Sequence, residues 1–209
     1  MDAENLLTQI AAEIRTCQNC PLGRTRKNPV PGAGPAGAEI MCIGEGPGHF
    51  EDEQGLPFVG ASGKFLTQLL EDGGIPRKSV FITNVVKCRP PDNRDPQPNE
   101  LQACNAFLDR QIAVINPLII ITLGRISMAR YFENARISSI HGEASWHAGR
   151  LIVPMFHPAA ALHQPNLKSV IAQDFSRLKE MIEKEKLRRA EKMAQVEKEE
   201  DNAAQLSLF

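Results

Sequence analysis

Four cysteines have the residue type and the spacing of a site for a soft metal. Cys17 and Cys20 form a C-x2-C pair, and Cys88 and Cys104 form a C-x15-C pair after a gap of 67 residues. Four thiolates suit structural zinc or an iron-sulfur cluster, because both bind sulfur ligands well. Zinc sites usually take two short pairs, so the wide second pair favours a [4Fe-4S] cluster. The alternative is a set of buried, inert thiols, which is what we expect of Cys42 inside an apolar run.

Polar and glycine-rich residues follow three apolar runs of the chain. These segments are GEGPGHFEDEQGLPFVG at 44–60, TNVVKCRPP at 83–91 and HPAAAL at 157–162. The first is too rich in Gly and Pro to form a helix and too long to be a simple turn. Loops that converge at one edge of a sheet are the usual anatomy of an active site, so we expect these segments to form one.

The elements that would position these loops are visible as apolar runs and helical patterns. Four runs are predicted to be strands, at 39–44, 79–86, 117–124 and 151–156. Their unbroken apolar character indicates strands that are covered on both faces. Helical patterns lie at 63–71, 99–115 and 125–132, and one long charged helix begins near residue 167. This alternation predicts an α/β fold, a three-layer α/β/α sandwich around a central, mainly parallel four-stranded sheet, with ligands beyond the carboxyl ends of its strands.

The composition of the 209 residues, 42% apolar and 23% charged, is typical of a soluble globular protein. The acidic, amphipathic start does not resemble a signal peptide, and no apolar run could cross a bilayer, so we expect a cytoplasmic protein without a membrane partner. The net charge is −1, but no acidic residue falls between Glu13 and Glu39, and basic residues dominate 77–94. These stretches are either DNA-facing patches or ordinary solvated surface.

Five motifs in order, over about residues 10–185, resemble those of the family 4 uracil-DNA glycosylases, the iron-sulfur branch of their superfamily. They are CxxCPLG, GEGPG, GLPFVG, TNVVKCRPP and HPAAAL. The resemblance implies an enzyme that flips uracil out of DNA and hydrolyses its N-glycosidic bond, which leaves an abasic site for base excision repair. It also implies a structural [4Fe-4S] cluster on Cys17, Cys20, Cys88 and Cys104, with no diffusible cofactor.

The matching positions imply roles in that reaction. Phe58 would stack on the flipped uracil, and Asn84 would pair with its O4 and N3–H, which a cytosine could not match. His157 would donate a hydrogen bond to O2 as charge builds up on the leaving base. Glu45 would stabilise the sugar cation or orient the attacking water. Gly46, in the uracil site, stands where the best-known branch of the superfamily carries a water-activating aspartate.

Other positions carry DNA contacts and one alternative chemistry. Gly48, Ser62 and Leu162 are predicted to contact DNA, with Leu162 as a wedge in the vacated base stack. His141, in ISSIHGE, matches a loop in a related group that traps the abasic sugar covalently, so a protein-DNA adduct is one alternative. A non-catalytic iron-sulfur DNA-binding module that is recruited to the sliding clamp is another.

The chain ends on QLSLF after a stretch, residues 177–201, in which eight basic and eight acidic residues cancel. Gln205, Leu206, Leu208 and Phe209 resemble the anchors of the pentapeptide with which bacterial replication and repair proteins dock on the sliding clamp. The alternative is an accidental terminus. We expect a glycosylase domain at 1–185, a charged helical or disordered tail at 186–204 and a clamp-binding peptide at 205–209. The expected protein is a monomer on the nucleoid of a bacterium.

Overall fold

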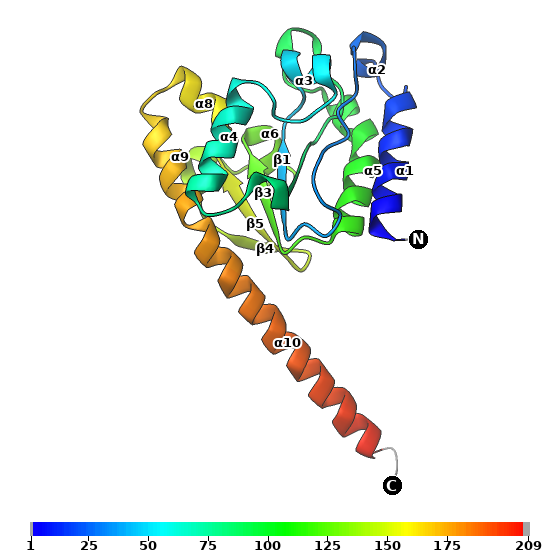
Figure 1. Cartoon of the computed structure of the whole chain (residues 1–209), viewed down its shortest axis with the longest axis vertical. Coiled ribbons are helices and arrows are strands. Elements are labelled where there is room, and N and C mark those ends of the chain that lie inside the picture. The colour runs from blue at the N-terminus through cyan, green and yellow to red at the C-terminus, as the bar shows by residue number, and fades with distance from the viewer. Residues whose placement is uncertain (1, 207–209) are drawn as a thin grey trace.

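The structure is a computed structural model that describes residues 2–206 and, of the side chains, those of residues 2–196 and 198. Its centre is a five-stranded sheet in the order β2-β1-β3-β5-β4. The strands are β1 (Ile40–Gly44), β2 (Val80–Asn84), β3 (Ile119–Leu123), β4 (Ser145–His147) and β5 (Arg150–Met155). All pairs are parallel except β4 with β5. The predicted α/β fold with a mainly parallel sheet is confirmed (Figure 1).

The predicted count of four strands is wrong, because a fifth strand forms one edge of the sheet. β4 has three residues and none of them is buried, so no apolar run marks it in the sequence. Ala148 and Gly149 join β4 to β5 with φ angles of 47° and 78°. Positive φ at both central positions is typical of the type I′ hairpin, whose twist suits a two-residue connection. The turn and the neighbouring strand, rather than burial, therefore define β4.

Ten α-helices lie among the described residues. They are α1 (Ala3–Thr16), α2 (Leu22–Thr25), α3 (His49–Gln54), α4 (Ala61–Asp72), α5 (Pro98–Ile115), α6 (Arg125–Met128), α7 (Ile137–Ile140), α8 (Pro158–His163), α9 (Leu167–Ser176) and α10 (Leu178–Leu206). The patterns at 63–71 and 99–115 correspond to α4 and α5. The pattern at 125–132 yields only the short α6, and the helix expected from residue 167 is divided at Arg177 into α9 and α10.

Helices cover both faces of the sheet (Figure 1). Met41 and Ile43 of β1 pack in a core cluster with α1 and α5, whereas Cys42 packs in a second cluster with α4 and α9. Because neither face meets water, the strands are apolar without alternation. Burial also raises the pKa of Cys42 to about 12, which agrees with the inert thiol expected at this position.

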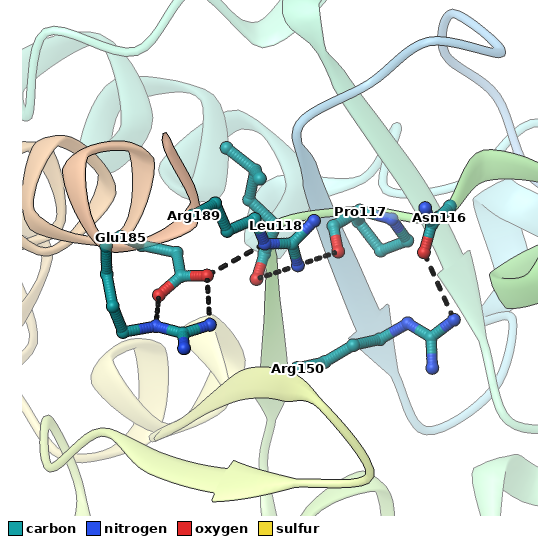
Figure 2. Close-up of polar contacts among 7 residues, drawn as sticks. Asn116, Pro117, Leu118, Arg150, Glu185 and Arg189 are labelled. Atoms are coloured by element: carbon teal, nitrogen blue, oxygen red, sulfur yellow. Dashed lines mark hydrogen bonds and ion pairs between the residues drawn. The ribbon is translucent and has the colours of Figure 1, made fainter. Parts of the chain in front are cut away.

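The first turns of the last helix anchor it to the body of the protein. Leu178 and Ile182 are buried in the core. One turn later the carboxylate of the buried Glu185 accepts hydrogen bonds from Arg188 and Arg189, and Arg189 donates to the carbonyl of Pro117 at 3.2 Å (Figure 2). Beyond these contacts α10 projects away from the sheet (Figure 1). No helix in the described part of the chain is long and apolar enough to cross a membrane.

Candidate active site

The loops after β1, β2 and β5 meet at the carboxyl edge of the sheet, at the end that carries α3 and α8 in Figure 1. They enclose a cavity of about 390 Å³. Seven predicted site residues line it: Glu45, Gly46, Gly48, Phe58, Ser62, Asn84 and His157. The rule that ligands bind beyond the carboxyl ends of parallel strands therefore located this cavity from the sequence.

Phe58 presents a buried aromatic ring to the cavity. Its side chain is only 6% exposed, and its backbone has a φ of 54°, in the left-handed region that large side chains rarely adopt. A Cβ at Gly44 would lie 2.8 Å from the ring, so only glycine fits there. The ring of Phe58 faces the imidazole of His157, with 5.6 Å between centroids and 29° between planes. This arrangement provides a flat apolar surface for a planar ligand.

Asn84 offers an acceptor that the protein itself leaves unused. It is the last residue of β2 and is 1% exposed. Its Oδ1 atom is buried and has no hydrogen-bond partner among the described residues. A buried acceptor without a partner costs about 1 to 3 kcal/mol. An N–H group of a ligand in the cavity would remove that cost.

His157 is built as a neutral hydrogen-bond donor. Its Nδ1 atom accepts the backbone N–H of Ala159 at 3.1 Å, so in the neutral ring the proton belongs on Nε2. Burial lowers the pKa of His157 to about 4, although the charge of Glu51 partly opposes this. The imidazole is therefore uncharged at neutral pH, with its Nε2–H available to a ligand.

Glu45, one of two glutamates that line the cavity, has a carboxyl group with a raised pKa. Burial raises its pKa, the nearby charge of Asp95 raises it further, and Arg125 lowers it. Asp95 and Arg125 form an ion pair at 2.5 Å, so the charges around Glu45 largely offset each other. Burial therefore dominates, and it favours the protonated form of this carboxyl group more than water would.

Four lining residues were not predicted: Glu51, Asn93, Ala159 and His163. Asp92 and Asn93 both have positive φ, at 53° and 54°. Asn and Asp are enriched in that region, so the sequence PPDN at 90–93 is typical of a turn. Nothing in the local sequence shows that this turn faces a cavity. The expectation that residues 44–60 form no helix is wrong, because His49–Gln54 form α3 between Gly48 and Gly55. Glu51 lies on this helix, and its charged neighbours in the sequence do not indicate that it is buried.

Two predicted residues lie outside the cavity. Leu162 lies on α8, is 50% exposed and is not among the residues that line the cavity. His141 pairs through Nδ1 with Asp174 at 2.7 Å and packs on the ring of Phe156. The side chains of Gln205 and Leu206 lie outside the described ones, and Leu208 and Phe209 lie outside the described residues altogether.

The predicted metal ligands come together from three parts of the fold. Cys17, Cys20, Cys88 and Cys104 line one small cavity between α1, the end of β2 and α5. Among the side chains of residues 2–196 and 198, no group of three or more His, Cys, Asp or Glu is compact enough to hold one metal ion. A [4Fe-4S] cluster keeps its ligands farther apart than a single ion does, because iron and sulfide atoms separate them.

Hydrogen-bond donors point at two of the sulfur atoms. Arg26 Nη1 donates to Cys88 Sγ at 2.9 Å, and the backbone N–H of Lys87 donates to Cys104 Sγ at 3.3 Å. Burial raises the pKa of Cys88 to about 11, although Arg26 opposes this, and burial also raises the pKa of Cys104. The donors stabilise negative charge on sulfur, which is the chemistry that an anionic cluster needs.

A buried lysine connects this cysteine site to the cavity. Lys87 is 1% exposed, and its ammonium group donates to Thr83 Oγ1 at 2.6 Å, the Asn84 carbonyl at 2.8 Å and Gln111 Oε1 at 2.7 Å. Burial lowers the pKa of Lys87 to about 7. The side chain thus ties α5, which carries Cys104, to the strand end that carries Asn84.

Comparison with known proteins agrees with this geometry. Residues 31–181 match the family described as the Uracil DNA glycosylase superfamily. A "Type-4 uracil-DNA glycosylase" of Sulfurisphaera tokodaii is 48% identical over 84% of this chain and 84% of its own length. Proteins of the same name from Archaeoglobus fulgidus and Thermotoga maritima are 42% and 40% identical, over 85% and 87% of this chain and 94% and 97% of their own lengths. The chain belongs to the uracil-DNA glycosylase superfamily.

Proposed function

We propose that this protein is a DNA-repair enzyme that flips uracil out of DNA and hydrolyses its N-glycosidic bond, which leaves an abasic site. The observation that carries the proposal is the buried, unpaired Oδ1 of Asn84 in the same cavity as the Phe58 ring and the neutral His157. The Type-4 uracil-DNA glycosylases that resemble this chain over most of their length support the same reaction.

Base selection follows from the amide of Asn84. Uracil N3–H would donate to Oδ1, and the amide N–H2 would donate to uracil O4. Cytosine offers an acceptor at N3 and a donor at N4. In the same position Oδ1 would face another acceptor and the amide N–H2 would face another donor, so neither hydrogen bond would form. The ring of Phe58 would stack on either pyrimidine, which means that the amide discriminates while the ring contributes affinity.

Bond cleavage uses the two other functional side chains of the cavity. As the bond between uracil N1 and the sugar C1′ breaks, its electron pair passes to uracil, and His157 Nε2–H would stabilise the negative charge on O2. Water then adds to C1′ of the sugar cation. The Glu45 carboxylate would stabilise that cation and accept the proton that the water loses. The proton finally reaches solvent or the released uracil anion.

The four cysteines would hold a [4Fe-4S] cluster with a structural role. The sulfur atoms of Cys88 and Cys104 already receive hydrogen bonds, and Cys17 and Cys20 complete the set across the same small cavity. A cluster there would tie α1 and α5 to the end of β2 without touching the reacting atoms. Protein purified without oxygen should show broad visible absorbance and contain about four iron atoms and four sulfides per chain. A colourless preparation with one zinc per chain would refute the cluster.

The central experiment incubates the protein with an oligonucleotide that contains one uracil and then cleaves abasic sites with alkali. We expect strand breakage at the uracil and none in a matched oligonucleotide with thymine or cytosine. No breakage at any pH or salt concentration would favour a non-catalytic DNA-binding module instead. A stable protein-DNA adduct on a denaturing gel that is lost on His141→Ala would favour the covalent alternative.

We also propose that the C-terminal peptide recruits a monomeric enzyme to a bacterial type of sliding clamp on the nucleoid. In this proposal residues 1–185 form the catalytic domain, 186–204 the tether and 205–209 the docking peptide. The sequence QLSLF and the projection of α10 away from the sheet support it. Deletion of residues 205–209 should abolish binding to the clamp and leave uracil excision unchanged. Unchanged clamp affinity would refute the assignment.

A further inference from the structure

The backbone that carries Phe58 needs support from its surroundings. Its left-handed φ of 54° costs an aromatic residue about 1 to 2 kcal/mol. The carbonyl of Phe58 also lies so close to the first turn of α4 that a Cβ at Gly63 would lie 1.9 Å from its oxygen. An unfavourable conformation of this kind persists only where neighbouring groups hold it.

One side of the segment is held by a cation. Arg77 Nη2 donates to the carbonyl oxygens of Pro57 at 3.0 Å and Phe58 at 3.2 Å. Its Nη1 donates to Thr67 of α4, which fixes the guanidinium itself. The two carbonyl groups around the Phe58 ring are thereby satisfied.

The other side of the segment is held by the buried carboxylate of Glu51. This residue of α3 is 8% exposed, and its Oε1 accepts the backbone N–H groups of Val59 and Gly60, each at 2.9 Å. Gly60 precedes the first residue of α4, so the negative charge also lies at the favourable end of that helix. The two N–H groups directly after Phe58 thus depend on one carboxylate.

The second oxygen of Glu51 occupies the space beside Gly48 that a side chain at that position would need. A Cβ at Gly48 would lie 2.9 Å from Oε2, so only glycine at that position leaves the carboxylate in place. Glu51 lines the same cavity as Phe58, Asn84 and His157. Glu51 therefore contacts both the backbone that follows Phe58 and the cavity that would bind the base.

We propose that Glu51 is a positioning residue of the uracil site, which sets the stacking ring of Phe58 by holding the backbone of Val59 and Gly60. The inference rests on the proposed function, since it assigns the ring to a flipped uracil. The role requires an acceptor of the correct reach. It does not require a negative charge, because two uncharged N–H groups are what the side chain holds.

Three variants separate reach from charge. Glu51→Gln keeps an oxygen at the same reach and loses the charge, Glu51→Asp keeps the charge and loses the reach, and Glu51→Ala loses both. Glu53→Ala is the matched control, because Glu53 lies on the same helix but faces Lys27 at the surface. Thermal unfolding of each variant shows whether it is folded at the assay temperature.

The readouts are the inhibition constant of free uracil, which reports base stacking without DNA, and kcat and KM for uracil excision. We expect Glu51→Ala to weaken free uracil about tenfold or more, since two buried N–H groups lose their acceptor. Glu51→Asp should behave similarly, Glu51→Gln should stay within about threefold of the wild type, and the Glu53→Ala control should not change.

The possible outcomes are distinct from one another. If the wild-type protein does not excise uracil, the proposed function fails before the variants are compared. If it does, a folded Glu51→Ala variant with unchanged uracil inhibition overturns the positioning role. So does the reverse order, with Glu51→Asp near wild type and Glu51→Gln impaired, because charge would then be the requirement. Should Glu51→Ala not fold, the order of the Gln and Asp variants alone decides.

Discussion

The charge state of His157 allows a quantitative prediction for both stability and catalysis. Its imidazole is buried, and its folded-state pKa of about 4 lies well below the ordinary value of 6.5. Between these two pH values the unfolded chain binds a proton at this position and the folded chain does not. Acid therefore favours unfolding, and the stability that neutral His157 permits is lost as the pH falls from about 6.5 toward 4.

The magnitude follows from the two pKa values. One unit of difference between the folded-state and unfolded-state pKa corresponds to about 1.4 kcal/mol, so the full loss is about 3 kcal/mol. Between pH 7 and pH 5 the loss amounts to about 2 kcal/mol. Urea unfolding of the wild type and of a His157→Asn variant, at both pH values, isolates this contribution, because the other titrating groups are common to the two proteins.

Catalysis should show the same neutral ring. NMR signals of the His157 imidazole should not titrate between pH 5.5 and 8. The pH profile of the uracil-excision rate should contain no transition near pH 6.5 that can be assigned to His157 by its loss in the His157→Asn variant. The acid limb of the rate should instead follow the raised pKa of Glu45. Two results together would refute the reasoning. They are a His157 titration centred near pH 6.5, and a difference in free energy of unfolding between wild type and variant that is the same at pH 7 and pH 5.

Three further predictions concern the cavity and the last helix. Glu45→Gln should lower kcat about a hundredfold with unchanged inhibition by free uracil; a full excision rate would remove Glu45 from the mechanism. Asn84→Ala should weaken free uracil about tenfold and reduce the preference for uracil over cytosine, as measured by kcat/KM, because the amide makes both discriminating contacts. Glu185→Ala should lower the free energy of unfolding in urea by about 2 kcal/mol, since Arg189 loses its carboxylate acceptor beside the core and keeps the carbonyl of Pro117. An exposed Glu183→Ala control should change it little, and excision per folded molecule should not change in either.

Much of the fold could be predicted because its signals are local. The strands β1, β2, β3 and β5 are continuous apolar runs, and burial on both faces is what produces such runs. β4 escaped prediction because a short edge strand is defined by its turn and its partner. The break between α9 and α10 at Arg177 was also missed, since no Gly or Pro marks it.

The candidate site divides in the same way. Phe58, Asn84 and His157 were accessible from motif order, because each lies next to a strand end or in a loop with unusual composition. Glu51 and Asn93 were not, because their importance depends on which face of α3 and which side of a turn meet the cavity. His141 resembles a catalytic residue in the sequence, yet it pairs with Asp174 of α9 and does not line the cavity.

The amino-acid sequence by itself determined the class of fold, the set of four cysteines and the side chains that would recognise a pyrimidine. Tertiary structure alone decided how these groups behave. It buries His157 until the imidazole is neutral, leaves Asn84 Oδ1 without a partner and brings Glu51 to the N–H groups that follow Phe58. The physical reason is that residue type fixes which interactions are available, whereas burial and contacts between distant segments fix what each group costs and which partner it still lacks.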